Sequence, residues 1–170
     1  MRVLIVSAVL AHAACGKPET TAPDTAAPAA TTETATETPA AAPADAAPDT
    51  AALQAAVAAL PAPYNAANYE AGRRVFAQCR SCHVIEAGAP NRVGPNLHGV
   101  FGREIGTAPG FNYSQPVQDA NFTWDAERLD HWLANPQTFL PGNRMAFAGV
   151  RDETQRRDLI AYLMVEAAAE

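Results

Sequence analysis

The stretch "CRSCH", residues 79–83, places two thiols three positions apart, with an imidazole directly after the second. Cysteines at this spacing occur in redox-active dithiols, in zinc sites and at points of haem attachment. In the haem case, Cys79 and Cys82 each add to a vinyl group at the porphyrin edge, and His83 lies beneath the iron. Only the haem interpretation uses all three residues.

The rest of the chain gives little support to the other two interpretations. A zinc site needs about four nitrogen or sulfur ligands, usually in paired clusters. The only other cysteine is Cys15, far away in the sequence. A thioredoxin-like dithiol belongs on a βαβ framework, and no parallel-strand pattern is present. We therefore predict one covalently attached haem.

An imidazole on one side of the iron leaves the other axial position to be assigned. The candidates are Met145, Met164, His98 and His131. Met164 lies in an expected helix, where packing explains it, and His131 is expected to face solvent. Met145 lies in "FLPGNRMAFAG", residues 139–149, a loop in which no helix packing requires a thioether. We predict Met145 as the ligand, with His98 as its rival.

The N-terminal stretch "MRVLIVSAVLAHAACG", residues 1–16, predicts export. Its apolar run is shorter than the about 20 residues that a membrane-spanning helix needs, but it has the length of the apolar core of a signal peptide. The end of the stretch resembles a bacterial lipoprotein signal, which predicts a lipid on Cys15, although His12 stands where an aliphatic residue is usual. The protein would then be anchored on the periplasmic side of a bacterial membrane. Cleavage after Ala13 would instead give a soluble periplasmic protein.

Residues 16–63 are mostly Ala, Thr and Pro, with no aromatic side chain. Such a segment buries too little apolar surface to offset roughly 1–2 kcal/mol of backbone entropy per residue. We expect a disordered tether, and we give little weight to a short Ala-rich helix at 49–60 because isolated helices of that length are marginal. The folded domain is predicted at 64–170, which holds every Trp, Tyr and Phe.

Charge divides along the same boundary. Residues 1–63 carry two cations and six acids, whereas residues 64–170 carry ten arginines and twelve acids. The folded part is nearly neutral and lacks the strongly basic composition typical of proteins that bind nucleic acid. We expect a monomer with no nucleic-acid partner.

The predicted domain is all-α, with three to five short helices and long loops. Helices are expected at 68–79 with Asn68 as cap, at 125–134 ending before Pro136, and from Asp152 onward. Residues 88–116 show no period of 2 or 3.6 residues and predict irregular loops. Because a few short helices enclose little core, the haem itself should fill the centre of the domain.

The domain resembles class I cytochrome c of the mitochondrial type, in particular a bacterial, membrane-tethered member. The resemblance runs from about residue 68 to 167. Six stretches carry it in order: "GRRVFAQCRSCH", "NRVGPNLHGVFGR", "GTAPGFNYS", "FTWDAERLDHWLANP", "PGNRMAFAG" and "DLIAYL".

The resemblance assigns roles to residues on both sides of the iron. It implies thioether bonds at Cys79 and Cys82, His83 and Met145 as axial ligands, and a hydrogen bond from the His83 ring to the carbonyl of Pro95. It also implies roles around the haem for Arg103, Tyr113 and Trp124 at the propionates, Trp132 in the distal pocket and Phe147 at the exposed haem edge. Gly72 is expected where the first helix crosses the last, near Leu159 and Tyr162, which belong to the core.

Three residues depart from the family pattern in the distal pocket. Val117 stands in place of an Asn, Trp132 in place of a Tyr, and Asn143 in place of a Thr in the Met loop. The lysine ring with which eukaryotic members dock on acidic partners is also absent. Its expected substitutes are Arg80, Arg92, Arg144 and Arg151.

The resemblance implies a one-electron carrier and not an enzyme, because an iron with two protein ligands has no open position for substrate. Its expected partners are a quinol:cytochrome c oxidoreductase as donor and a terminal oxidase (cytochrome c oxidase), or a photosynthetic reaction centre, as acceptor. Two alternatives remain open. The protein would be a haem peroxidase if Met145 dissociated, or an electron-entry subunit if it were bound to a periplasmic dehydrogenase.

Overall fold

The structure, a computed structural model, describes residues 49–168. Within them the elements are α1 (Thr50–Ala58), the 3-10 helix η1 (Tyr64–Ala66), α2 (Tyr69–Phe76), α3 (Gln115–Asp119), α4 (Ala126–Ala134), α5 (Pro136–Phe139) and α6 (Glu153–Glu166). No strand forms in this range, where one isolated antiparallel bridge joins Glu104 and Thr123. None of the helices in it has the length and hydropathy to cross a membrane. The all-α prediction is confirmed, and three short helices, α1, α3 and α5, add to those expected.

Short polar residues start the three principal helices, as predicted. Asn68, Asp125 and Asp152 each accept a hydrogen bond from the backbone amide three residues later, at 2.7, 2.7 and 2.8 Å. These bonds satisfy amides that have no partner within the helix. Pro136 has a second role that was not predicted. The chain turns after α4, and Pro136 then opens α5, because proline is favoured at the first position of a helix.

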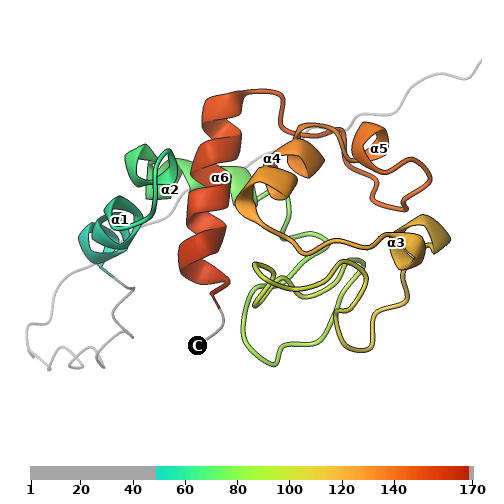
Figure 1. The fold of residues 1–170 in the computed structure, drawn as a ribbon. Helices are drawn as coiled ribbons and strands as arrows, with labels where there is room; N and C mark the ends of the chain where they lie inside the picture. Colours follow the sequence, from blue (N-terminus) through green and yellow to red (C-terminus); the bar gives the residue numbers. More distant parts are fainter. Residues whose placement is uncertain (1–48, 169–170) are drawn as a thin grey trace, which may run out of the picture. The chain divides into compact units, whose positions relative to one another are not determined.

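Helix α6 is the centre of the fold, and α2 crosses it closely (Figure 1). Gly72 lies at the crossing, where a Cβ atom would stand 2.2 Å from the backbone oxygen of Asp158 and 2.7 Å from Cβ of Tyr162. No other residue fits at that distance, so the expected small residue at the crossing is confirmed. Leu159 and Ile160 are fully buried beside it, as predicted.

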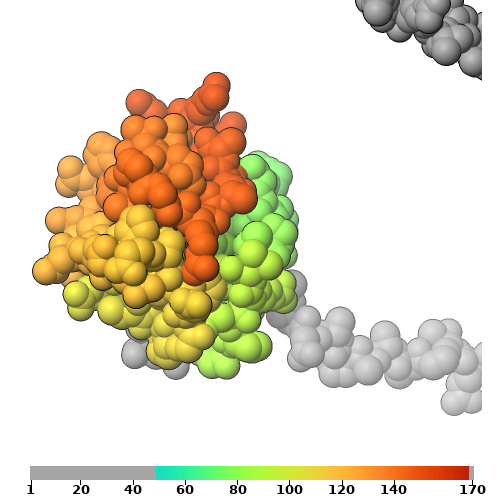
Figure 2. All heavy atoms as spheres, turned by 90° about the vertical axis from the view of Figure 1, so that its right-hand side faces the viewer, coloured from blue at the N-terminus to red at the C-terminus, as the bar shows by residue number. Residues whose placement is uncertain are grey.

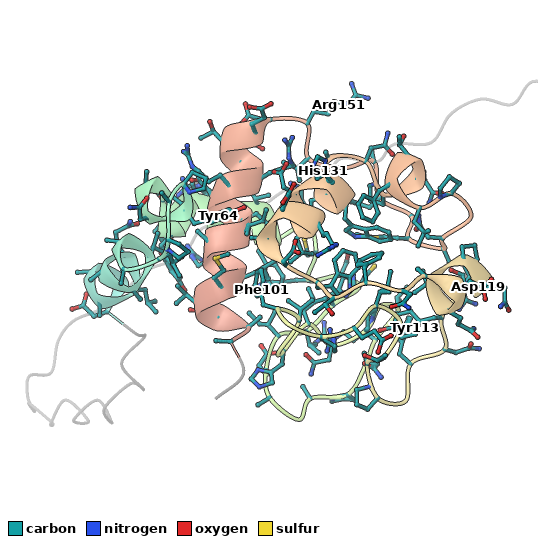
Figure 3. The ribbon with its side chains drawn as sticks, viewed as in Figure 1. Tyr64, Phe101, Tyr113, Asp119, His131 and Arg151 are labelled. Atoms are coloured by element: carbon teal, nitrogen blue, oxygen red, sulfur yellow. The ribbon has the colours of Figure 1, made fainter. Side chains whose placement is uncertain are left out.

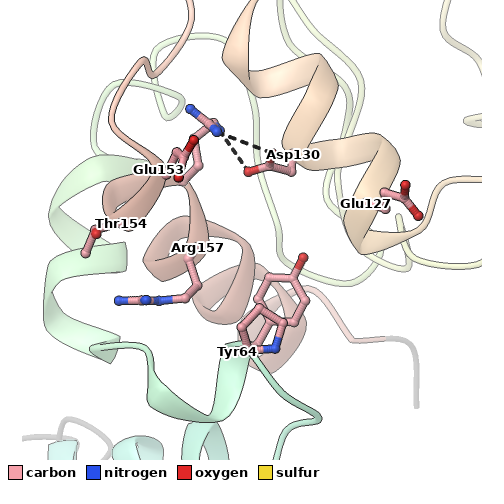
Figure 4. A pocket seen from close by; sticks show the side chains of 8 residues that line it. Tyr64, Glu127, Asp130, Glu153, Thr154 and Arg157 are labelled. Carbon is pink, nitrogen blue, oxygen red and sulfur yellow. Dashed lines mark hydrogen bonds and ion pairs between the residues drawn. The ribbon is translucent and has the colours of Figure 1, made fainter.

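A partly buried ion pair connects α6 with α4. The Arg156 guanidinium donates to Asp130 at 2.8 Å, and also to the carbonyl oxygens of Val150 and Arg151 at 3.0 and 2.9 Å. Figure 4 shows this pair in a cleft of about 490 Å³ between the two helices, with Tyr64 at the opposite side. The cleft is lined by none of the site residues predicted from the sequence. We therefore treat it as a structural feature of the α4 and α6 contact.

Helix α1 corrects the predicted boundary between tether and domain. Residues 49–63 were assigned to the tether, yet Val57 is fully buried and Leu53 and Leu60 pack against the core. Gln54 donates to the carbonyl of Ala67 at 3.0 Å and accepts from the amide of Tyr69 at 2.8 Å. Docking on the core therefore stabilises a helix that would be marginal in isolation, and the little weight given to a helix at 49–60 was wrong. The remaining tether residues, 16–48, lie outside the described range.

Val57→Ala is expected to lower the free energy of unfolding by about 2 kcal/mol, because it removes two methyl groups from a fully buried position. Urea unfolding of the haem-loaded protein measures the loss, with Ala56→Gln at an exposed position of the same helix as the control. Equal stabilities of the Val57→Ala variant and the wild type would mean that α1 is not docked.

Candidate functional site

Helix α2 ends at Phe76, earlier than the predicted end at residue 79, and a run of turns leads the chain through the attachment motif. The amide of Cys79 donates to the carbonyl of Phe76 at 2.8 Å, and the amides of Cys82 and His83 donate to the carbonyl of Cys79 at 3.0 and 2.8 Å. Both cysteines are free and half-buried. One backbone turn thus holds the two sulfur atoms and the imidazole in a fixed order along the chain.

The imidazole of His83 is oriented by a single strong contact. Its Nδ1 lies 2.7 Å from the carbonyl oxygen of Pro95. A carbonyl can only accept, so Nδ1 carries the hydrogen and the lone pair of Nε2 is free for a metal. Burial lowers the pKa of His83, against the opposing effect of the Pro95 carbonyl. Burial favours the neutral ring, and the Pro95 contact fixes the tautomer that a ligand to iron requires.

Gly94 forms a cradle beneath the same ring. A Cβ atom on Gly94 would lie 2.3 Å from Cε1 of His83 and 2.8 Å from its Nε2. The amide of Gly94 donates to the carbonyl of Cys82 at 2.8 Å, which ties this segment to the attachment turn. His83 also lines an open concavity of about 250 Å³, together with Arg80 and Arg92. The His83 ring is therefore held by close packing against Gly94 as well as by its hydrogen bond to Pro95.

The two thiols are poorly suited to redox exchange as a dithiol. Burial, followed by the neighbouring Cys82, raises the pKa of the Cys79 thiol to about 11. Reactive dithiols instead lower the pKa of the attacking thiol. Within residues 49–168, no three His, Cys, Asp or Glu side chains are grouped so as to hold a metal ion. A porphyrin supplies four of the ligands to its iron, so the protein has to supply only the axial ligands. A single oriented imidazole such as that of His83, with two nearby thiols, therefore fits haem.

A polar edge of the site contains Arg103, which has no carboxylate partner among residues 49–168. It is half-buried, donates to the carbonyls of His98 and Asn96 at 3.2 and 3.0 Å, and has a pKa lowered by burial. Ser114 adds a buried hydroxyl with no hydrogen-bond partner in the described part of the chain. Tyr113, whose pKa is raised by burial, lies beside Ser114 in the sequence. A carboxylate such as a propionate would satisfy these groups.

Aromatic side chains line the apolar part of the site. The rings of Trp124 and Trp132 meet edge to face at 5.5 Å, and Phe122 and Phe139 pack around them. Half-buried side chains packed on the core cluster include Cys79, Leu97, Phe101, Trp124, Trp132 and Phe147. Figure 3 places Phe101 and Tyr113 along the irregular segment between α2 and α3. In Figure 2 that segment meets the chain from α4 to α6 on one face, seen as lime, yellow and orange.

The four candidates for the second axial position stand in different settings. Met164 lies in α6 and packs against the core, and His131 is exposed, both as predicted. Met145 is half-buried in the loop between α5 and α6, and its backbone is bonded to Asn143 and Gln137. His98 is half-buried three residues after Pro95, in the segment that contacts His83.

Several residues of the site were missed from the sequence. No role was predicted for Gly94, because its close approach to the His83 ring depends on how the two segments meet in the fold. No role was predicted for Ser114, whose hydroxyl has no hydrogen-bond partner in the described part of the chain, or for Gln137, which bonds to the Met145 loop. Val117, which stands in place of an Asn in the family pattern, is buried and apolar, and its backbone oxygen limits the space at Gly106.

Comparison with known proteins yields close relatives, although no protein-family model matches the chain. Cytochrome c of Kluyveromyces lactis is 42% identical over 106 residues, which cover 62% of this chain and 96% of the relative. Cytochrome c2 of Blastochloris viridis is 45% identical over 107 residues, 63% of this chain and 84% of the relative. Cytochrome c 2.1 of Caenorhabditis elegans is 43% identical over 104 residues, 61% of this chain and 93% of the relative. The chain therefore belongs to the class I cytochrome c family, as an electron carrier with one covalently attached haem c.

Proposed function

We propose that this protein carries single electrons on an iron held between His83 and Met145, with thioether bonds at Cys79 and Cys82. The observation that supports this most is the 2.7 Å contact between His83 Nδ1 and the Pro95 carbonyl, which leaves Nε2 free. His98 is less suitable as the second ligand, since its segment contacts His83 from the proximal side. The bound haem supplies a one-electron couple, and a thioether ligand with burial favours its ferrous state.

We propose that Arg103, Tyr113 and Trp124 surround the propionates. The guanidinium of Arg103 has no carboxylate partner among residues 49–168, which supports this role, because a half-buried cation is stabilised by a nearby carboxylate. Trp132 and Phe147 would cover the apolar part of the ring, since both pack against the core and remain only half-buried.

We propose that the protein is not an enzyme. With Met145 on the iron, peroxide has no position at which to bind. The test is a ferric spectrum at neutral pH together with a peroxide assay. A six-coordinate spectrum with a thioether band and no peroxide turnover supports the carrier, whereas sustained peroxide reduction would favour the peroxidase alternative. Stable co-purification with a dehydrogenase would favour the electron-entry alternative.

We propose a quinol:cytochrome c oxidoreductase as donor and a terminal oxidase, or a photosynthetic reaction centre, as acceptor. Arg80, Arg92, Arg144 and Arg151 are all exposed and offer cations for acidic partners. Oxidation of the reduced protein by oxidase-containing membranes is therefore expected to slow as ionic strength rises, because salt screens exposed charges. A rate independent of salt would speak against docking through these arginines.

We also propose a location on the periplasmic side of a bacterial membrane, with a lipid on Cys15. This residue lies outside the described range, and the proposal rests on the sequence alone. Cys15→Ser is expected to move the protein from the membrane fraction to the soluble periplasm without changing its spectrum, because durable anchoring requires acyl chains. The masses of the mature N-terminal peptides measure this directly. An unmodified peptide beginning "ACGKPET" in the wild type would instead show cleavage after Ala13.

A further inference from the structure

Two amide side chains hold the backbone of Met145. Asn143 Oδ1 accepts a hydrogen bond from the Met145 amide at 2.8 Å. Gln137 Nε2 donates to the Met145 carbonyl oxygen at 3.1 Å. Met145 lies in no helix or strand, so these side chains replace the bonds that regular structure would provide.

Asn143 is itself fixed on all sides. It is one of three buried polar residues among those described, at 7% exposure. Its Nδ2 donates to the carbonyl oxygens of Pro136 and Leu140, both at 2.8 Å. These two residues begin and follow α5, which Figure 1 shows beside the loop leading to α6. One buried amide thus ties the Met145 loop to a helix.

Gln137 joins the same network from the surface. Its Nε2 lies 3.3 Å from Asn143 Oδ1 and 3.2 Å from the Asn143 carbonyl oxygen, besides its bond to Met145. The side chain is exposed, in contrast to that of Asn143. The two residues therefore form a clamp in which the buried member sets the geometry and the exposed member completes it.

We propose that Asn143 and Gln137 are positioning residues that hold the sulfur of Met145 on the iron. The inference rests on the proposal that Met145 is the axial ligand. When the Met145 backbone is fixed, only the torsions of its side chain remain free. Less conformational entropy is then lost when the sulfur binds the iron. Without the clamp, the loop would release the sulfur more often, and another ligand would compete more easily for its position.

The clamp requires an amide and not merely a polar residue. Asn143 accepts from the Met145 amide and from Gln137 while it donates to two carbonyls, and a threonine hydroxyl, with its single hydrogen, cannot donate to both. An aspartate would keep the acceptor but place a charge against the carbonyl oxygens of Pro136 and Leu140. We therefore expect Asn143→Thr to reproduce the clamp only in part.

Imidazole binding to the ferric holoprotein tests the clamp, because added imidazole competes with the sulfur for one position on the iron. We expect Asn143→Leu to raise the apparent affinity for imidazole on the order of tenfold, and Gln137→Ala by a smaller factor. Gln115→Ala is the matched control, since it removes an exposed amide whose hydrogen bond is to Asp119, outside the Met145 loop. It should leave the affinity unchanged.

A double-substitution cycle separates the clamp from general stability. In a Met145→Ala background, Asn143→Leu should change imidazole affinity by less than twofold, because no sulfur remains to be held. An equal effect in both backgrounds, or no effect of Asn143→Leu in the wild type, would overturn the clamp. If Asn143→Leu fails to fold, Gln137→Ala decides by the same comparison. Unchanged imidazole affinity in Met145→Ala itself would instead refute the ligand assignment.

Discussion

Met145→Ala is expected to abolish the thioether-to-iron charge-transfer band of the ferric protein and to lower its midpoint potential. The sulfur stabilises ferrous iron, and water or hydroxide in its place stabilises ferric iron. The drop should be on the order of 0.1 V or more, within the roughly 0.8 V range that axial ligands cover. Absorption spectroscopy and redox titration measure the two effects.

Met164→Leu is the control for this experiment. Met164 packs on the core from α6, so its substitution should leave both the band and the potential nearly unchanged. If the band persisted in Met145→Ala, a different ligand would have to be assigned, and His98 would be tested next.

Cys82→Ser is expected to leave a loosely held haem on a poorly folded domain. One of the two covalent links between the chain and the haem is lost, so the haem is held at a single point. The aromatic side chains around the site also depend on the haem, because they pack on the core yet remain half-buried. Denaturing electrophoresis stained for haem and far-ultraviolet circular dichroism report the two losses.

Ser81→Ala, between the two cysteines, is the control for Cys82→Ser. The exposed Ser81 hydroxyl makes only long contacts, of 3.4 Å to the Gln78 carbonyl and 3.6 Å to the Cys82 sulfur. Its removal should leave haem content and folding unchanged. A Cys82→Ser protein that unfolded cooperatively without haem would contradict the view that the cofactor is part of the core.

Local signals in the sequence predicted the parts of the fold that local forces determine. Asn68, Asp125 and Asp152 mark the starts of the three principal helices and cap them, since capping depends on residues only three positions apart. A helix at 49–60 was given little weight because isolated helices of that length are marginal, and the burial of Val57 that stabilises α1 comes from distant elements. Tertiary contacts decide such helices.

The site divides in the same way. The motif at 79–83 was readable because its three functional residues lie within one turn, and the Pro95 carbonyl was reached through family resemblance. The fit of Gly94 beneath the His83 ring and the orphaned hydroxyl of Ser114 appear only when distant segments are brought together. The clamp on Met145 was also unpredictable, because its bonds run between α5 and a loop.

The central claim, an iron between His83 and Met145, is tested most directly by the methyl resonances of methionine in the reduced protein. A methyl group that lies over the porphyrin is shifted strongly upfield by the ring current, whereas one packed in the protein core is not. In protein labelled at the methionine methyl groups, we predict one such shifted resonance that persists in Met164→Leu and is absent in Met145→Ala. The absence of any shifted methyl resonance in the wild type, or its loss in Met164→Leu alone, would contradict the assignment of Met145.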